Sequence, residues 1–259
     1  MDVNAKGLQI GYGDCVVVKE MDVHICKNKI TTIIGPNGSG KSTVLKAITR
    51  LLHYQKGMVE IDGRDLKSFG SKEFARRIGV LPQMHSAPAD FRVKELVSYG
   101  RMPYQHLFST RSEEDERIIN ESMKATGTYH LRDKSIHELS GGESQRVWIA
   151  TVLTQQPEIL FLDEPTTYLD ISHQIETMRM VKHLNRETGM GVVMVLHDLS
   201  HALEVSDHII VIKDGKKYSE GTPSKVITPE MLHDVYHVDA DIVHLTGREK
   251  PVIAFRELA

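Results

Sequence analysis

The segment Gly35–Ser42 restricts the fold of this chain more than any other part of its sequence. It reads Gly-Pro-Asn-Gly-Ser-Gly-Lys-Ser and matches the pattern G-x-x-x-x-G-K-[ST]. The β-branched run Ile30–Ile34 precedes it, and apolar residues at helical spacing extend from Val44 to Leu52. The sequence therefore predicts a strand, a phosphate-binding loop and a helix in direct succession, within an α/β fold.

Each residue type in this loop suits a bound phosphate. Glycines let backbone N–H groups approach the anion closely, and the N-terminus of the following helix favours negative charge. Lys41 would reach the β- and γ-phosphates of a nucleotide, and the hydroxyl of Ser42 would bind Mg²⁺. The predicted nucleotide-binding residues of this segment are Gly35, Pro36, Asn37, Gly38, Ser39, Gly40, Lys41, Ser42 and Thr43.

A second nucleotide motif follows the apolar run Ile159–Leu162, which ends in Asp163 and Glu164. A carboxylate at the end of a buried strand is well placed beside Mg²⁺, so Asp163 is the candidate partner of the ion, through water. Glu164 stands one residue further on, where a general base for the attacking water could lie. Phosphoryl transfer depends on an oriented nucleophile and neutralised phosphate charge, which these carboxylates and Lys41 would supply.

Composition excludes several other classes of protein. Lys and Arg number 32 against 35 Asp and Glu, which argues against a dedicated nucleic-acid binder with a strong basic excess. The longest apolar runs of the chain fall far short of the roughly 18 residues of a membrane-spanning helix. The start Met1–Lys6 has no signal-peptide pattern, and the two cysteines, Cys15 and Cys26, are expected to be reduced thiols of a cytosolic protein.

Hydrophobic periodicity predicts strands at both ends of the chain and helices between them. The predicted strands are Val16–Val18, Met21–Ile25, Ile30–Ile34, Met58–Ile61, Ile78–Leu81, Ile159–Asp163, Val192–Leu196 and His208–Ile212. The predicted helices are Val93–Gly100, one that begins at the capping box Ser112–Asp115, one after Gly141-Gly142, and Ile171–Glu187. A terminal hairpin is predicted from Ile242–Leu245 and Val252–Phe255, around Thr246-Gly247.

The segment Leu139–Arg146 reads Leu-Ser-Gly-Gly-Glu-Ser-Gln-Arg. Together with the two nucleotide motifs it resembles the ATP-binding-cassette (ABC) ATPases, whose signature is LSGGQ-like; Glu143 is a common variant at its fifth position. The order along the chain also matches that family, with Gln83 before the signature and Asp170 and His197 after Asp163-Glu164. The resemblance covers essentially the whole chain.

The resemblance implies a P-loop NTPase fold of the ABC-ATPase type. This fold has a mostly parallel core sheet, an N-terminal antiparallel β-subdomain and an inserted helical subdomain. It implies one ABC ATPase domain over residues 1–259. Residues 1–83 and 156–259 would form the nucleotide-binding core with its β-subdomain, and residues 84–155 the helical subdomain that carries the signature.

The family pattern also implies roles for single residues. Tyr12 would stack on adenine, Gln83 would touch Mg²⁺ and the attacking water, and His197 would lie near the γ-phosphate. Asp170, the D-loop aspartate, would act across a homodimer. In that dimer each of two ATP molecules lies between the phosphate loop of one subunit and the signature of the other. The predicted sets are catalytic Glu164, His197, Gln83 and Lys41; Mg²⁺-binding Ser42, Gln83 and Asp163; and partner-ATP-binding Ser140, Gly141, Gly142 and Glu143.

The segment Phe91–Tyr104 resembles the V-x-E-L-V-x-Y-G-R-x-P stretch of importers for iron-siderophore, haem and cobalamin complexes. This likeness implies an ATP-hydrolysing subunit of a bacterial importer, peripheral on the cytoplasmic face of the cell membrane, with a ferric siderophore favoured as substrate over haem or cobalamin. A membrane permease would dock near Gln83–Tyr104, and an extracytoplasmic binding protein would be an indirect partner. The predicted permease contacts are Met84, Phe91, Tyr99, Met102 and Tyr104.

Three other classes of cassette protein fit the sequence less well. DNA-repair cassettes insert a long coiled coil before the signature, whereas residues 42–139 contain no sustained heptads. Translation factors of the family carry two cassettes, and this chain has one. A non-hydrolysing scaffold would not need the complete set Lys41, Asp163, Glu164 and His197. The pairs His197/His201 and His233/His237 have metal-ligand spacing, but no third ligand is evident nearby.

Overall fold

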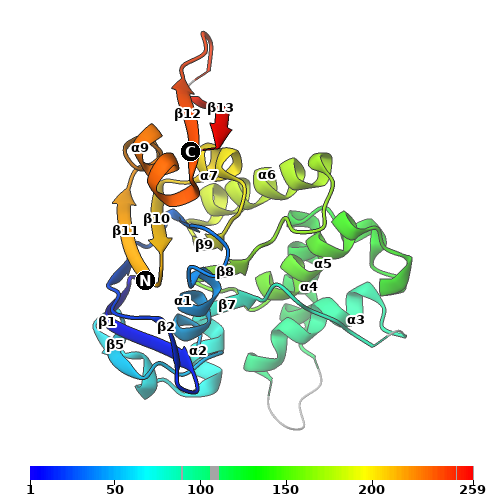
Figure 1. Cartoon of the computed structure of the whole chain (residues 1–259). Coiled ribbons are helices and arrows are strands. Elements are labelled where there is room, and N and C mark those ends of the chain that lie inside the picture. The colour runs from blue at the N-terminus through cyan, green and yellow to red at the C-terminus, as the bar shows by residue number, and fades with distance from the viewer. Residues whose placement is uncertain (89, 106–110, 249, 259) are drawn as a thin grey trace. The chain divides into compact units, whose positions relative to one another are not determined.

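The computed structural model describes residues 1–88, 90–105, 111–248 and 250–258. The chain divides into two compact units, Met1–Leu66 with Val193–Ala259, and Lys67–Val192 (Figure 1). The predicted helical region 84–155 lies inside the second unit, which also holds two strands. Within the described residues, no helix combines the length and the apolar character that crossing a bilayer requires.

The first unit contains an antiparallel sheet built from the N-terminal strands. Its long strand β1 (Val3–Tyr12) pairs antiparallel with β2 (Cys15–Val18), β3 (Val23–Ile25) and β5 (Lys56–Ile61), and β5 pairs with β6 (Arg64–Asp65). Side chains in β1 and β3 alternate between buried and exposed, as in a sheet with one face on a core. The predicted antiparallel β-subdomain is confirmed.

The same unit holds a second sheet around the fully buried strand β4 (Ile30–Ile34). β4 runs parallel to β10 (His208–Lys213), and β9 (Gly191–Val195) lies on its other side, where Leu196 N–H donates to Ile33 O at 3.2 Å. β10 turns at Asp214-Gly215 into β11 (Lys216–Gly221). Strands buried on both faces need helices over them, which is the architecture of an α/β protein.

Helix α1 (Lys41–Ile48) follows the phosphate loop, but it ends earlier than the apolar spacing up to Leu52 predicted. Arg50 takes a positive φ of 63°, and the N–H groups of Leu51 and Leu52 both donate to Lys46 O. This arrangement closes the helix, and Leu51 is 56% exposed as a result. The other helices of the unit are α7 (Leu199–Val205), α8 (Pro223–Val226) and α9 (Pro229–Met231), followed by a π-helical turn at Leu232–Tyr236.

The predicted terminal hairpin is present with different bounds. Strands β12 (Val238–Val243) and β13 (Val252–Leu258) pair antiparallel, so Leu245 lies beyond the strand that was expected to contain it. Direct cross-strand pairs such as Ile242 with Ile253 fix the register.

The second unit combines two parallel strands with a group of helices. α2 (Ser71–Arg77) leads into β7 (Ile78–Leu81), which pairs parallel with β8 (Ile159–Asp163). α3 (Val93–Ser98), α4 (Glu113–Ala125) and α5 (Gly141–Leu153) lie together in the green part of Figure 1. They share a core of Val93, Leu96, Val97, Ile119, Met123, Leu131, Val147 and Ala150. The long helix α6 (Ile171–Thr188) follows β8.

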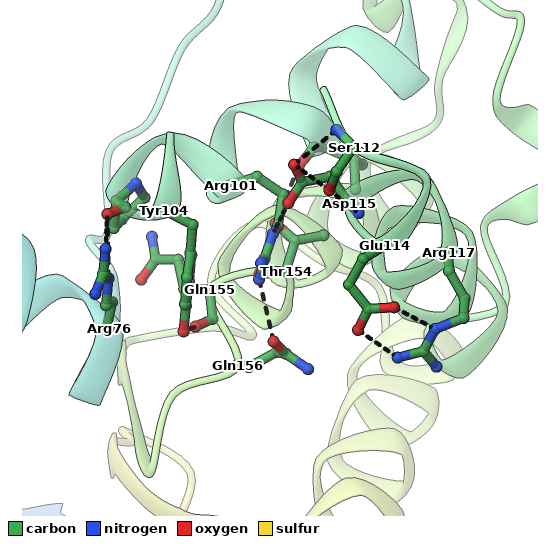
Figure 2. Close-up of polar contacts among 12 residues, drawn as sticks. Arg76, Arg101, Tyr104, Ser112, Glu114, Asp115, Arg117, Thr154, Gln155 and Gln156 are labelled. Carbon is green, nitrogen blue, oxygen red and sulfur yellow. Dashed lines mark hydrogen bonds and ion pairs between the residues drawn. The ribbon is translucent and has the colours of Figure 1, made fainter. Parts of the chain in front are cut away.

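The helix predicted to end at Gly100 ends at Ser98 instead and continues as a 3₁₀ helix over Tyr99–Tyr104. Figure 2 shows what holds this segment. The buried guanidinium of Arg101 donates to Asp115 Oδ1 at 2.8 Å and to Thr154 O at 2.8 Å. Gly100 is needed because a Cβ there would stand 1.8 Å from Thr154 Oγ1. A buried ion pair with Asp115 at the N-terminus of α4 and a hydrogen bond to Thr154 O at the C-terminus of α5 thus fix the segment to both helices.

Candidate functional site

The phosphate loop joins β4 to α1, as predicted, and its glycines take conformations that other residues rarely adopt. Gly35, Gly38 and Gly40 have φ values of +150°, +77° and +104°. A Cβ on Gly35 would also stand 2.0 Å from Ile212 O of β10. No side chain caps the N-terminus of α1. The turn therefore has the glycine conformations and the uncapped helix N-terminus that suit a bound phosphate.

Lys41 is the buried cation of the loop. Its side chain folds back so that Nζ donates to Gly35 O and Pro36 O, each at 2.9 Å. The residue is 5% exposed, and a buried ammonium is costly unless such partners satisfy it. Ser42 is half-buried in the first turn of α1 and Thr43 is buried, whereas Asn37 and Gly38 are exposed. The loop thus carries a fixed positive charge among its backbone N–H groups.

Two further predicted residues belong to the same unit. Tyr12 ends β1 with half of its surface exposed, opposite Cys15 in the hairpin. His197 is exposed and lies two residues after the end of β9. Because Leu196 bonds to Ile33 of β4, His197 and Gly35 leave neighbouring strands at the same edge of the sheet. The loop and the predicted switch histidine are therefore neighbours in the sheet topology.

In the second unit, Gln83 and Glu164 form a direct hydrogen bond. They follow the parallel neighbours β7 and β8, and Gln83 Nε2 donates to Glu164 Oε2 at 2.6 Å. Thr167 Oγ1 donates to the same carboxylate oxygen at 3.1 Å. Glu164 has a φ of +54°, a conformation uncommon outside functional sites and tight turns. Asp163, the last residue of β8, is buried. The Asp163 carboxylate is thus buried, and the Glu164 carboxylate lies beside the Gln83 amide.

These groups border a cavity of about 320 Å³ within the second unit. Residues 82–85 form one side and residues 141, 144 and 145 of α5 another. Asp163, Glu164 and residues 167–169 complete the lining. The predicted base, the glutamine and the start of the signature helix thus line a single hollow.

The signature segment begins α5 with a reciprocal cap. Glu143 N–H donates to Ser140 Oγ at 3.2 Å, and Ser140 N–H donates to Glu143 Oε2 at 2.8 Å. This backbone hydrogen bond holds the pKa of the Glu143 carboxyl below its ordinary value, with help from the Ser140 hydroxyl. Glu143 was predicted to contact the ATP of a partner; in the isolated chain its carboxylate caps its own helix. Gly141 is exposed and Gly142 is buried.

Asp170 caps α6 in a similar way. Its Oδ1 accepts the N–H of His173 at 2.9 Å and the hydroxyl of Ser172 at 2.8 Å. These bonds, the one from the His173 backbone first, lower the pKa of the Asp170 carboxyl. The D-loop aspartate is therefore an ionised, locally held group.

The ABC transporter family model matches residues 18–167, which include the phosphate loop, Gln83, the signature and Asp163-Glu164. The chain belongs to the ABC transporter ATPase family. It is 44% identical over 250 residues to the iron(3+)-hydroxamate import ATP-binding protein FhuC of Bacillus subtilis, covering 96% of this chain and 93% of FhuC. It is 44% identical over 236 residues to the ferric enterobactin transport ATP-binding protein FepC of Escherichia coli, covering 91% and 87% of the two chains.

A solved structure supports the same assignment. The bacterial ABC transporter cassette MJ0796, determined as a dimer, is 29% identical and superposes with a TM-score of 0.74 over 85% of this chain and 98% of its own. The predicted family, fold and ATPase activity are confirmed. As a member of the ABC transporter ATPase family, the chain binds ATP.

Some residues of this ABC ATPase site were missed by sequence reasoning. The His85 ring lies 4.8 Å from the Trp148 ring of α5, and burial lowers the pKa of His85. Its Nδ1 is also 3.1 Å from Pro82 O, so it links the Gln83 loop to the signature helix. His173 contacts the signature from α6. Neither histidine belongs to a motif. The one signal in the sequence is that His85 lies two residues after Gln83 and His173 three residues after Asp170.

The predicted permease contacts of the ABC ATPase fall into two groups. Met84, Tyr99 and Met102 are exposed, with fractions of 88%, 47% and 57%. Phe91 is half-buried and stacks on Tyr99 at 5.5 Å. Tyr104 packs inward, because its ring lies beneath Arg101 and its hydroxyl donates to Gln155 O at 2.9 Å. The first three therefore offer free apolar surface. Residue 89 of this segment is outside the described residues.

Proposed function

We propose that this chain drives the import of ferric-siderophore complexes in a bacterium. The observation that carries the proposal is the 44% identity to FhuC over 96% of the chain. FepC, a ferric enterobactin transport protein, is equally similar, and the siderophore-type segment Phe91–Tyr104 is present. The substrate itself would contact the permease and an extracytoplasmic binding protein, while this chain stays peripheral on the cytoplasmic face of the cell membrane.

We propose the following residue roles, which the geometry of each unit supports in part. The N–H groups of Gly35–Gly40 and the Lys41 ammonium would bind the β- and γ-phosphates, and Tyr12 would support adenine. Glu164, held by Gln83 and Thr167, would orient the attacking water and accept its proton. His197 would stabilise the γ-phosphate. Ser140, Gly141, Gly142 and Glu143, with Asp170, would act on the ATP bound by a partner copy.

The donor set for Mg²⁺ is consistent with that ion. Ser42 offers a hydroxyl, Gln83 an amide oxygen and Asp163 a buried carboxylate, and such hard oxygen ligands are those that Mg²⁺ prefers. When bound, Mg²⁺ neutralises phosphate charge. The chain's own part is to hold these oxygens at the start of α1 and at the ends of β7 and β8.

The permease would dock on the exposed side chains of Met84, Tyr99 and Met102. Apolar and aromatic side chains of this kind are enriched at protein interfaces. Since these residues follow Gln83 in sequence, a shift of the Gln83 loop with the state of the nucleotide would reach the permease.

Uptake measurements test the transported substrate. Deleting the gene in its host should abolish uptake of radiolabelled ferric siderophores, including ferric hydroxamates, and leave haem and cobalamin uptake unchanged. The unsubstituted chain should restore uptake, and the Glu164→Gln chain should not. Loss of haem or cobalamin uptake alone would show that the substrate is wrong. Unchanged uptake of all three would contradict a role in their import.

A further inference from the structure

Gly142 of the signature segment is in close contact with the imidazole of His173 from α6. A Cβ on Gly142 would lie 2.4 Å from His173 Cγ and 2.7 Å from both Cδ2 and Nδ1. Gly142 is buried and is not among the residues with positive φ. Its lack of a side chain is therefore required by the ring that occupies this space, and backbone conformation is not the reason.

The ring is held in this position by a second contact between α5 and α6. His173 Nδ1 lies 3.2 Å from Glu176 Oε2, and the same oxygen accepts Arg146 Nη1 at 2.9 Å. Arg146 stands one turn after Gly142 on α5, and Glu176 one turn after His173 on α6. The side chains of His173 and Arg146 are only 29% and 16% exposed. We call Gly142, Arg146, His173 and Glu176 the α5–α6 clasp.

The clasp is continuous with the D-loop. The backbone N–H of His173 donates to the side chain of Asp170, the N-cap of α6. The residue that contacts the signature glycine therefore also holds this aspartate. Leu169 adds to this link, because Gln174 Nε2 donates to its carbonyl at 2.9 Å and a Cβ on Gly141 would be 3.6 Å from its Cδ2. The signature and the D-loop therefore belong to one packed group.

We propose that His173 is a positioning residue that sets the signature turn of Ser140–Gly142 relative to Asp170. The inference rests on the proposed function, in which both segments engage the ATP site of a partner copy. Two groups that must meet one nucleotide together gain from a fixed mutual geometry, and a displacement of about 1 Å can cost about 100-fold in rate. His173 contacts neither the nucleotide nor the reacting atoms in this scheme.

Replacing the ring tests the proposal. His173→Ala should leave ATP binding by the monomer unchanged, because the phosphate loop is intact. It should weaken ATP-dependent dimerisation in a Glu164→Gln background and lower kcat of ATP hydrolysis roughly 10-fold or more. His173→Asn keeps a planar group and an N–H near Glu176, and should recover most of kcat. A matched control is His183→Ala on the same helix, whose His183–Glu187 pair is far from the signature; it should change nothing.

A double substitution separates positioning from simple loss of stability. Gly142→Ala should be severely impaired because its Cβ meets the ring. If the clasp is responsible, adding His173→Ala should restore part of the dimerisation that Gly142→Ala loses. Both measurements use the full chain, and thermal unfolding of each variant gives its stability separately.

The outcomes are distinct. A His173→Ala chain that dimerises and hydrolyses ATP like the unsubstituted one overturns the inference and leaves the proposed function standing. The inference is also overturned if His173→Ala loses dimerisation and kcat in proportion to a fall in thermal stability, His173→Asn does not recover them, and His173→Ala does not restore dimerisation to Gly142→Ala. An unsubstituted chain that neither dimerises with ATP nor hydrolyses it overturns both the proposed function and the inference.

Discussion

The phosphate loop and the signature segment are both glycine-rich turns at the start of a helix, yet they are built on opposite principles. In the phosphate loop the glycines take positive φ, and no side chain caps α1. In the signature, Ser140 and Glu143 cap α5 reciprocally, and Gly142 is a glycine because His173 lies against it. The first turn is ready to bind an anion by itself, whereas the second depends on its neighbouring helix.

The largest expected effect comes from substituting Glu164, which lies outside both turns. Glu164→Gln removes the proton acceptor but keeps a hydrogen-bonding side chain for Gln83 and Thr167. ATP hydrolysis should fall by about 10²–10⁴-fold, the usual contribution of a general base. ATP binding should persist, and dimers should accumulate in size-exclusion chromatography. Undiminished hydrolysis would show that Glu164 is not the base.

Lys41→Ala tests the claim that the phosphate loop binds nucleotide within a single chain. Removing a buried ammonium held at 2.9 Å by two loop carbonyls should raise the Kd for ATP by about 100-fold or more, the equivalent of roughly 3 kcal/mol. Calorimetric titration of the monomer measures this. The control is Lys46→Ala on the same helix, and retained tight ATP binding would contradict the assignment of the loop.

Ser140→Ala sharpens the contrast, because the signature should not matter for binding by the monomer. Loss of the cap should cost about 1 kcal/mol of stability. ATP binding to the monomer should stay unchanged while ATP-dependent dimerisation weakens. Weakened binding to the monomer would show that the two turns are not separate in the way described.

The smallest expected effect is a pH dependence of stability. The folded chain lowers the pKa of both Glu143 and Asp170, so each stabilises the fold above its ordinary pKa near 4. That contribution is lost as the pH falls through the lowered folded values. Glu143→Gln and Asp170→Asn should therefore lower the Tm modestly at pH 7 and flatten its fall below about pH 4.5, so that the variant and unsubstituted chains converge in acid. If Tm depends on pH in the same way in the variants and the unsubstituted chain, the two carboxylates do not stabilise the fold through these capping hydrogen bonds.

The sequence by itself determined the family, the order of elements and the residues of the phosphate loop. These are local properties: residues 35–42 are contiguous, their glycines carry their own conformational preference, β4 is β-branched at every position, and β8 is apolar up to its final Asp163. The sequence did not determine the end of α1. The helix stops at Ile48 and Arg50 takes a positive φ, which the spacing of apolar residues does not reveal.

Only the tertiary structure decided which distant residues meet. It paired Gln83 with Glu164, turned Tyr104 inward so that its hydroxyl bonds to Gln155 O, placed His85 on Trp148, and placed the His173 ring where Gly142 has no side chain. Each contact joins residues far apart in the chain, and each depends on the packing of two elements whose separate sequences contain no sign of the other. A glycine that matches a motif is visible in sequence, but the neighbour that requires it is not.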